Sequence, residues 1–311
     1  MSPRIGVVCN PTAGHDRAAR ARSAVLSGLA GDGRTVLDLT GRDYADALAR
    51  ARAALAEGLD ALVVVGGDGM AHLGANVLVG TGLPLGVVAV GSGNDIASAL
   101  GLPVHDVGAS LDSLRRALES RTSRVVDAVA VSTPGQAPSR WYVSSLCAGL
   151  DAAVAVHAAR LRWPRNGGRY VRAIFAELSA FRPYGVRITA DGETWEQDAT
   201  LVTVSNTPLF GGGMKVAPGA QPDDGMLDLV TAAGLPRHAV LRLFPLLFSG
   251  RHVDHPAVRV RRARSVRIEP LTERGANPPV AVVDGEPLAA LPLQCDGHPR
   301  ALRVLTPTVE A

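Results

Sequence analysis

Ala61-Leu62-Val63-Val64-Val65-Gly66-Gly67-Asp68-Gly69-Met70 is the stretch from which the architecture of this chain can be predicted. It opens with five apolar residues, three of them β-branched, which is typical of a strand buried on both faces in a parallel sheet. Glycines follow, and glycine can adopt positive φ and let backbone N–H groups surround a phosphate. From Met70 onward apolar residues recur at helical spacing, which places a helix N-terminus and its partial positive charge at the same spot. The stretch therefore predicts a buried strand, a phosphate-binding turn and a helix.

Asp68 is the unexpected residue of this turn. A carboxylate repels phosphate, so its presence indicates either a bound Mg²⁺ or a proton-transfer role. The alternative is that the glycines only form a tight connection between strand and helix. A second loop of the same kind, Gly91-Ser92-Gly93-Asn94-Asp95, follows another apolar strand and favours a binding site.

Composition places the chain among globular proteins. Its 311 residues are 47% hydrophobic and 20% charged, which is enough for two domains. The net charge of +3 is too small for a nucleic-acid-binding surface. The three cysteines, Cys9, Cys147 and Cys295, lack metal-type spacing and are expected to be free thiols in a reducing cytoplasm. Because we find no signal peptide and no apolar run of about 18 residues, we expect a cytoplasmic protein without a transmembrane segment, which meets a membrane only at its surface.

The first part of the chain predicts an open parallel sheet. Residues 4–120 alternate strands and helices at the spacing of βαβ units, with strands at 4–9, 35–39, 61–65 and 85–90. In such a sheet the ligand lies beyond the carboxyl ends of the strands, where all four following loops meet. The expected nucleotide-binding α/β domain covers residues 1–124.

The second part of the chain predicts a β-rich domain over residues 125–295. Short strands are expected at 125–132, 141–146, 185–190, 199–205, 227–232, 257–262, 266–269 and 280–283, interrupted by helices near 151–162, 169–181 and 237–249. Regular short strands separated by turn residues are typical of an antiparallel sandwich or barrel. The expected fold class is therefore α/β plus β, with a parallel-sheet domain followed by a β-sandwich-like domain.

Two acidic turns in the second part can carry chemistry. Asp223-Asp224-Gly225 offers hard oxygen ligands for Mg²⁺, although Asp-Asp-Gly is also a common turn. Asp284-Gly285-Glu286 follows an apolar strand and is either a hairpin turn or a pair of carboxylates held at a strand end. Phosphoryl transfer needs a carboxylate within hydrogen-bond reach of the acceptor hydroxyl.

Six motifs occur in the order and spacing of a known family. They are NPTAG at 10–14, GGDGM at 66–70, GSGND at 91–95, FGGGM at 210–214, APGAQPDDGMLDL at 217–229 and DGE at 284–286. Together they resemble the diacylglycerol kinase and sphingosine kinase family of lipid kinases over essentially the whole chain. The resemblance implies an ATP- and Mg²⁺-dependent kinase that phosphorylates the hydroxyl of a diacylglycerol-like lipid, giving phosphatidic acid. It also implies a cleft between the two domains and a C-terminal strand, within 296–311, that returns to the first domain.

The site residues that the resemblance implies follow motif by motif. For the nucleotide they are Asn10, Pro11, Thr12, Ala13, Gly14 and Thr40; for its phosphates Gly66, Gly67, Asp68, Gly69, Met70, Ala71 and His72; and beside them Ser92, Asn94 and Asp95. The Mg²⁺ site falls on Asp224, with the carbonyls of Gln221 and Met226. The proton acceptor falls on Glu286 or Asp284, and Asp68 joins them as a catalytic residue.

Met70 departs from the usual bacterial pattern GGDGT of that family. A hydroxyl contact is lost there, while the backbone N–H groups remain. Sphingosine kinase-like sequences also carry an apolar residue at this point, so a sphingosine, ceramide or other lipid-alcohol acceptor stays an alternative. For His72 a structural role beside a core is the competing interpretation.

Two further functions are alternatives to that of a lipid kinase. A soluble NAD kinase shares the GGDG turn and a β-rich domain, but the GSGND loop and the two acidic turns fit the lipid kinases better. A catalytically silent lipid- or nucleotide-binding protein is disfavoured because the acidic residues are all present, namely Asp68, Asp95, Asp224, Asp284 and Glu286.

The expected partner is a lipid substrate presented at a membrane surface, and a homodimer is possible. An arginine cluster just before the Asp284 turn can hold anionic headgroups at about 1 kcal/mol per residue, or it is a solvated strand face. Its members are Arg259, Arg261, Arg262, Arg264 and Arg267. The apolar helices at 171–181 and 239–248 either line an acyl-chain tunnel or belong to the core.

Overall fold

The computed structural model describes residues 2–10, 15–30, 33–161 and 168–306. They divide into two compact units, which are described separately. Unit 1 comprises Met1–Ala128 and Arg300–Ala311, and unit 2 comprises Val129–Pro299. Both ends of the chain therefore contribute to unit 1.

Unit 1 is built on a parallel sheet. Its strands β1 (Arg4–Cys9), β2 (Thr35–Asp38), β3 (Ala61–Gly66) and β4 (Pro84–Ala89) are arranged in the order β2-β1-β3-β4. Every neighbouring pair is parallel, so the carboxyl ends of all four strands lie along one edge. Strand β15 (Leu293–Leu305) adds its last residues beside β4, also in parallel. The predicted return of a C-terminal strand to the first sheet is thus observed.

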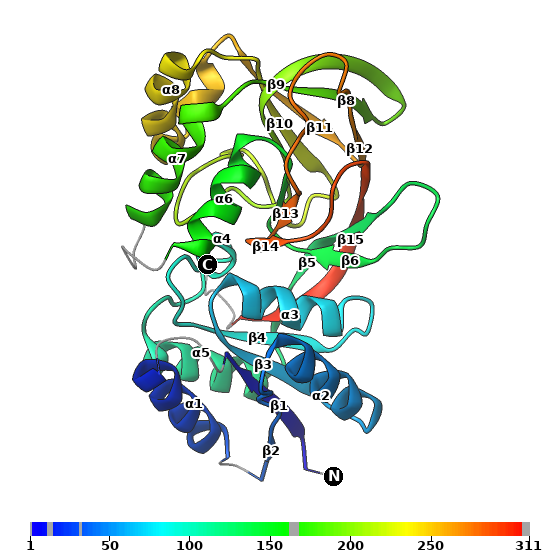
Figure 1. Cartoon of the computed structure of the whole chain (residues 1–311). Coiled ribbons are helices and arrows are strands. Elements are labelled where there is room, and N and C mark those ends of the chain that lie inside the picture. The colour runs from blue at the N-terminus through cyan, green and yellow to red at the C-terminus, as the bar shows by residue number, and fades with distance from the viewer. Residues whose placement is uncertain (1, 11–14, 31–32, 162–167, 307–311) are drawn as a thin grey trace. The chain divides into compact units, whose positions relative to one another are not determined.

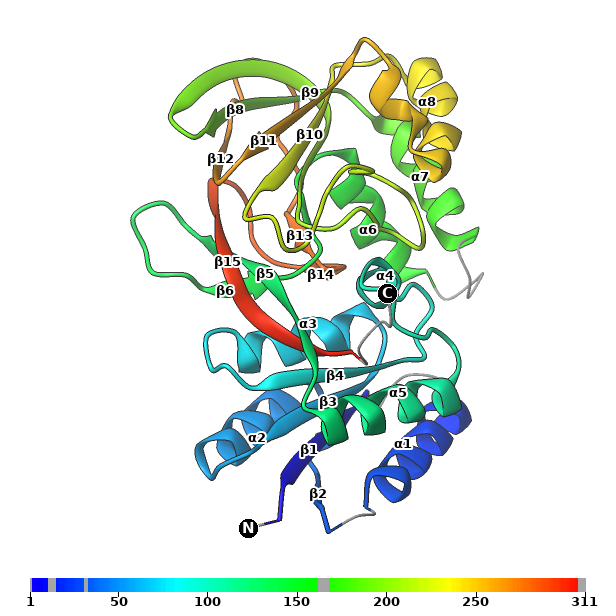
Figure 2. The same ribbon diagram turned by 180° about the vertical axis from the view of Figure 1, so that it is seen from behind.

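Helices cover both faces of this sheet (Figures 1 and 2). The helices are α1 (His15–Leu29), α2 (Tyr44–Ala56), α3 (Asp68–Leu78), α4 (Asp95–Ala99) and α5 (Val107–Ser120). Val63 and Val65 of β3 point to the same core as Val25 of α1 and Leu114 of α5. The intervening Val64 faces Gly74 of α3 on the other side. All six residues of β3 are buried, which is why its sequence is an unbroken apolar run.

Unit 2 is an antiparallel β structure. Its strands are β6 (Arg140–Tyr142), β7 (Ser145–Cys147), β8 (Tyr184–Ala190), β9 (Glu193–Ser205), β10 (Leu227–Ala233), β11 (Val258–Ala263), β12 (Ser265–Pro270), β13 (Val282–Val283) and β14 (Glu286–Pro287), and β5 (Ser123–Ser132) and β15 run into it. Inward-facing residues such as Leu146, Ile188 and Leu229 form its core. The fold class predicted from the sequence is confirmed.

Three helices cover the strands of unit 2 on one side (Figure 1). They are α6 (Leu150–Arg160), α7 (Gly168–Ala180) and α8 (Arg237–Ser249), followed by the short 3-10 helix Arg251–Asp254. Their apolar faces meet in one cluster that includes Val154, Ile174 and Val240. Within the described part of the chain, no helix combines the length and the apolar character needed to cross a bilayer.

The prediction of one strand over 141–146 is wrong. The chain breaks at Val143 and Ser144, because the carboxylate of Asp284 accepts hydrogen bonds from the amides of Val143, Ser144 and Ser145. The amides of Val143 and Ser144 are therefore not available for a strand ladder, and β7 begins at Ser145. The strand predicted at 280–283 begins two residues later in the structure, where β13 covers Val282–Val283 and a tight hairpin follows it.

Candidate functional site

The turn between β3 and α3 uses its glycines for space and not for positive φ. Gly67 caps α3 with a φ of −101°, and neither Gly66 nor Gly69 is among the positive-φ residues of the described chain. A Cβ atom on Gly91 would lie 2.4 Å from the Cα of Gly67, so the two glycine loops pack backbone against backbone. The expectation of positive φ is therefore corrected, while the close approach of two bare backbones is what the sequence pattern requires.

The second loop is held in shape by Asn94 and joined to the first loop by backbone hydrogen bonds. This residue adopts a left-handed conformation (φ 62°) and is buried. Its Oδ1 accepts from the Gly91 amide at 3.0 Å, and its Nδ2 donates to the Gly91 carbonyl at 2.9 Å. The amides of Val90 and Gly91 in turn donate to the carbonyl of Gly66. Asn94 thus fixes the shape of the second loop, and the Gly66 carbonyl holds that loop against the first.

Asp68 connects the same two loops. It is the first residue of α3, and its Oδ1 accepts from the amide of Ile96 in α4 at 3.0 Å. A Cβ atom on Gly93 would meet the Asp68 Oδ2 at 2.8 Å, so only glycine fits there without displacing the carboxylate. The carboxylate of Asp68 therefore has a structural role at α4 in addition to any role toward a ligand.

The residues that follow Asp68 in α3 have buried side chains. Met70 packs its Cγ over Gly66, where an added Cβ would lie only 2.4 Å away. His72 is completely buried and lies with its Nε2 3.2 Å from the Nδ2 of Asn76. Ala71 is buried as well. A phosphate at this helix end would therefore meet backbone N–H groups, and the structural interpretation of the His72 side chain fits this geometry.

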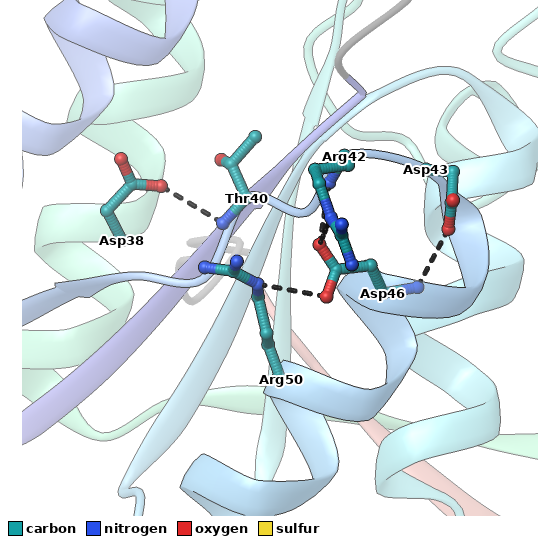
Figure 3. A network of polar contacts seen from close by, with 6 residues as sticks. All are labelled: Asp38, Thr40, Arg42, Asp43, Asp46 and Arg50. Atoms are coloured by element: carbon teal, nitrogen blue, oxygen red, sulfur yellow. Dashed lines mark hydrogen bonds and ion pairs between the residues drawn. The ribbon is translucent and has the colours of Figure 1, made fainter.

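Thr40 and Asn10 lie at the same edge of the sheet. Thr40 Oγ1 accepts from the amide of Cys9 at 3.2 Å, and its own amide donates to Asp38 Oδ1 at 3.0 Å (Figure 3). The Asn10 amide donates to the carbonyl of Val65, next to the glycine turn. Pro11, Thr12, Ala13 and Gly14, which the resemblance also assigns to the nucleotide, lie outside the described residues.

Beyond Thr40, the start of α2 is fixed by its own polar network (Figure 3). Asp43 is the N-cap and accepts from the Asp46 amide, while Asp46 accepts from the amide and side chain of Arg42 and from Arg50. The hydrogen bond from the Arg42 amide, with the two guanidinium groups, lowers the pKa of Asp46 to about 2. These charged groups therefore stabilise the N-terminus of α2, which orients the loop that carries Thr40.

In unit 2 the acidic turns share one edge of the sheet. Asp228 of β10 pairs with Ser205 of β9, Ser205 pairs with Ser145 of β7, and Leu146 pairs with Val283 of β13. The turn that precedes β10 and the hairpin after β13 therefore lie about 15 Å apart, three strand spacings, along this edge. The structure brings Asp224, Glu286 and the chain around Asn206 to a common side of unit 2.

Asp284 and Glu286 occupy different positions in their hairpin. Asp284 and Gly285 both have positive φ (48° and 87°), as a two-residue type I′ hairpin turn requires, and β13 pairs with β14 around them. The carboxylate of Asp284 is buried and accepts from three backbone amides at 2.8–3.3 Å. Glu286 is half-buried, and its carboxylate has no hydrogen bond or ion pair with the residues that the structure describes. The hairpin and the acidic pair, which the sequence left as alternatives, are thus both present.

Sequence reasoning missed the polar groups that support this hairpin. Asn206 donates from Nδ2 to the Val143 carbonyl at 2.9 Å, and its amide donates to the Ser144 carbonyl at 2.7 Å. Ser144 Oγ lies 2.9 Å from Thr207 Oγ1. The sequence signal for these groups was the pair Ser144 and Ser145, which lies within a predicted strand that is otherwise apolar. Buried hydroxyl groups need hydrogen-bond partners.

The oxygen atoms around Asp224 are of the kind that binds Mg²⁺, and an arginine lies beside them. Asp224 Oδ1 accepts from the Met226 amide at 3.0 Å, and Oδ2 is paired with Arg262. Asp228 is buried, and its Oδ2 has no hydrogen-bond partner within the described chain. Burial raises the pKa of Asp228, Arg262 lowers it and Asp224 raises it, so two carboxylates share one guanidinium. Among the described residues no group of three or more His, Cys, Asp or Glu side chains could hold a metal, so backbone carbonyls such as those of Gln221 and Met226 would have to complete a Mg²⁺ shell.

An apolar cavity of about 80 Å³ lies between the helices and strands of unit 2. Its lining includes Val154, Ile174, Met214 and Phe244. Asp151 also lines it, and burial raises the pKa of this carboxyl, which accepts from Thr203 Oγ1 at 2.7 Å and from the Gly149 amide at 2.8 Å. The helices predicted at 171–181 and 239–248 therefore contribute to a core and to a cavity wall.

The arginine cluster before the Asp284 turn is largely neutralised. Arg261 pairs with Glu193 at 2.5 Å and lies 5.2 Å from the ring centre of Trp195. Arg262 pairs with Asp224, and Arg267 with Glu269. Such pairing reduces the positive charge that the cluster offers to anionic headgroups.

Known proteins resemble this chain over nearly its whole length. A model of the diacylglycerol kinase catalytic domain matches residues 4–128, and a model of the YegS C-terminal NAD kinase beta sandwich-like domain matches residues 144–306. A Mycobacterium tuberculosis protein named diacylglycerol kinase is 35% identical over 305 residues, which cover 98% of this chain and 95% of that protein. A Pseudomonas fluorescens protein named "Probable lipid kinase YegS-like" is 31% identical over 268 residues, which cover 84% of this chain and 82% of that protein. A solved Bacillus anthracis structure, described provisionally as a diacylglycerol kinase, has the same fold, with a TM-score of 0.76 at 21% identity over 97% of each chain.

Proposed function

Since the chain belongs to the family of diacylglycerol kinases and YegS-like lipid kinases, we propose that it transfers the γ-phosphate of ATP to the hydroxyl of a diacylglycerol, giving phosphatidic acid. As a member of a kinase family it is a phosphotransferase that uses ATP. The name of the Mycobacterium tuberculosis relative supports diacylglycerol as the acceptor. Sphingosine, ceramide or another lipid alcohol is the second candidate, because Met70 replaces the threonine of the bacterial pattern.

The nucleotide phosphates are proposed to lie at the carboxyl edge of the sheet in unit 1. There the first turn of α3 offers backbone N–H groups, and the packed loops at Gly67 and Gly91 leave the backbone uncovered by side chains. Thr40 and Asn10 lie at the same edge. Asn94 fixes the second loop and the Gly66 carbonyl holds it against the first before ATP arrives, so little ordering is needed on binding.

Glu286 is proposed as the group that takes the proton from the acceptor hydroxyl. The observation that carries this assignment is the contrast with Asp284, whose oxygens already accept from three amides. A carboxylate so occupied is a poor proton acceptor, whereas the carboxylate of Glu286 has no such partners among the described residues. Asp284 then acts as a positioning residue, because it shapes the hairpin that presents Glu286.

Mg²⁺ is proposed as the accompanying cation, and it would neutralise charge that develops on the phosphates. Asp224, with the carbonyls of Gln221 and Met226, would hold a cation in unit 2, and Asp228 supplies a buried oxygen nearby. These residues also fix the turn that leads into β10, through the Met226 amide and Arg262.

The test separates the base from the positioning residue. Phosphate transfer from γ-labelled ATP should be measured on diacylglycerol, ceramide, sphingosine and NAD, with Glu286→Gln and Asp284→Asn beside the unmodified protein. Glu286→Gln should lower turnover by about 10²–10⁴-fold with an unchanged unfolding midpoint, as expected for loss of a general base. Asp284→Asn should lower the free energy of unfolding by about 1–3 kcal/mol. The side-chain NH₂ that replaces one carboxylate oxygen cannot accept hydrogen bonds from the backbone amides. Transfer to NAD alone, or full turnover by Glu286→Gln, would refute the proposal.

A further inference from the structure

Helices α7 and α8 expose large apolar side chains on the helical side of unit 2. Phe175 of α7 is 61% exposed, and Phe248 of α8 is 48% exposed. Val171 lies one turn before Phe175, and Leu241 lies two turns before Phe248, and both are exposed as well. The two helices are neighbours on the same side of the unit (Figure 1). We call these four residues the outer apolar face.

The outer apolar face is not needed for packing within the described chain. Both helices already bury another stripe, since Ile174 and Leu178 of α7 and Val240 of α8 meet in one cluster. The opposite side of a surface helix is normally polar. Exposed apolar residues gathered on two adjacent helices indicate an interaction surface.

The charges beside this face have one predominant sign. The described residues of the two helices and their ends include exposed Arg172, Arg182, Arg237, Arg242 and Arg251. The acidic residues of the same segments are Glu177, which lies 2.7 Å from the Nδ1 of His157, and Asp254. Aromatic and aliphatic side chains flanked by arginine are the pattern of a surface that inserts into an anionic lipid interface.

We propose that the outer apolar face docks the protein on an anionic bilayer, with Phe175, Val171, Leu241 and Phe248 inserted among the lipids. This inference rests on the proposed lipid acceptor and names the surface through which that acceptor is reached. It also places membrane contact on α7 and α8, and not on the arginine cluster of β11 and β12, where three of five arginines are paired with carboxylates.

An aromatic contact connects this face to the apolar cavity. Phe248 packs edge-on against Phe244, with ring centres 5.6 Å apart, and Phe244 lines the cavity. A lipid tail beside Phe248 would therefore lie next to Phe244, which forms part of the cavity wall.

A second copy of the chain fits this face less well than a bilayer. A two-fold dimer brings the same patch of both subunits together, so arginines of one subunit would face arginines of the other. Like charges placed opposite one another disfavour association. An anionic lipid surface has the complementary charge.

The experiment measures vesicle binding of the full-length protein by co-sedimentation, without ATP. The probes are vesicles of phosphatidylcholine alone and of phosphatidylcholine with phosphatidylglycerol. Phe175→Ser/Leu241→Ser should lower partitioning onto mixed vesicles by about tenfold or more. Arg172→Gln/Arg242→Gln should lower it by about fivefold per arginine, only on the anionic vesicles and less so at high salt.

Matched controls lie on the strand side of unit 2. Val260→Ser, at a residue of β11 that is 44% exposed, and Arg259→Gln/Arg264→Gln should leave partitioning unchanged. All variants should keep the unfolding midpoint and the turnover on a short-chain, water-soluble acceptor.

Several outcomes would overturn the inference. They are unchanged vesicle binding by Phe175→Ser/Leu241→Ser, an equal loss with the strand-side controls, or a lost dimer in sedimentation velocity with vesicle binding intact. A protein that binds anionic vesicles through this face but phosphorylates no lipid would refute the proposed function and leave the docking surface standing.

Discussion

At the scale of single residues, Asp68 combines two roles that one substitution would confuse. Its carboxylate accepts from the Ile96 amide at the start of α4 and lies at the N-terminus of α3 beside the phosphate-loop candidates. Asn can still accept the hydrogen bond from Ile96 through its amide oxygen but carries no charge. Ala removes both the acceptor and the charge.

Two variants of Asp68 should therefore differ in stability and agree in activity. Asp68→Asn is expected to keep the free energy of unfolding within about 0.5 kcal/mol of the unmodified protein, whereas Asp68→Ala should lose about 1 kcal/mol, the usual value for a helix cap. Both should lose turnover on a soluble acceptor, because the charge beside the phosphates is gone. Urea unfolding and steady-state kinetics measure the two effects, and full turnover of a folded Asp68→Asn protein would show that Asp68 has only the structural role.

At the scale of elements, the pairing of Arg262 on β11 with the turn before β10 can be tested against a metal. A guanidinium beside Asp224 competes with a divalent cation for the same carboxylate. Removing Arg262 should lower the Mg²⁺ concentration for half-maximal activity, by about fivefold if the pair is worth about 1 kcal/mol. Asp224→Asn should raise that concentration.

The matched control on the same strand is Arg259→Gln, which should not change the Mg²⁺ titration. A second measurement needs no turnover: Mg²⁺ should raise the unfolding temperature of Arg262→Gln more than that of the unmodified protein. Identical Mg²⁺ titrations for all three variants would mean that this turn is held by Arg262 alone and takes no cation.

How far the elements could be predicted depends on the range of the interactions that define them. The parallel strands of unit 1 follow from local apolar runs, and β1 begins and ends where the sequence predicts. The break between β6 and β7 could not be predicted locally, because it is made by Asp284, about 140 residues further along the chain. The acidic hairpin could be predicted from the local sequence. The different surroundings of Asp284 and Glu286 could not, because the amides that bind Asp284 are equally distant along the chain. The cavity was also beyond prediction, since it is lined by α6, α7, α8 and strands that meet only in the folded unit.

At the scale of the whole molecule, buried His252 links stability to pH. Burial lowers the pKa of His252, whose Nε2 lies 2.9 Å from the Val216 carbonyl oxygen. In the unfolded chain the imidazole binds a proton near pH 6.5, whereas in the folded protein it stays neutral to lower pH. The stability that depends on neutral His252 is therefore complete above about pH 6.5 and is lost as the pH falls below it, by up to about 1.4 kcal/mol per pH unit.

The expected result is a flatter pH dependence of unfolding in His252→Gln between pH 6.5 and pH 5, measured by urea midpoints. Burial raises the pKa of Asp151, which acts in the opposite direction, but this contribution is common to both proteins and cancels in the difference. His238→Gln, at an exposed residue of α8, is the control and should retain the steep profile. A His252→Gln profile parallel to that of the unmodified protein would contradict the linkage.

Strand β15 also affects the order in which the chain can fold during synthesis. Its final residues complete the sheet of unit 1 beside β4, yet they follow all of unit 2 in the sequence. During synthesis the first four strands of unit 1 therefore leave the ribosome long before β15, the fifth strand of this sheet, has been made. Until then β4 has an open edge, which is a template for pairing with another nascent chain. The strands of unit 2 are contiguous in sequence, so unit 2 can complete its fold before unit 1 does. The middle of the chain therefore folds before the last strand completes the sheet of unit 1.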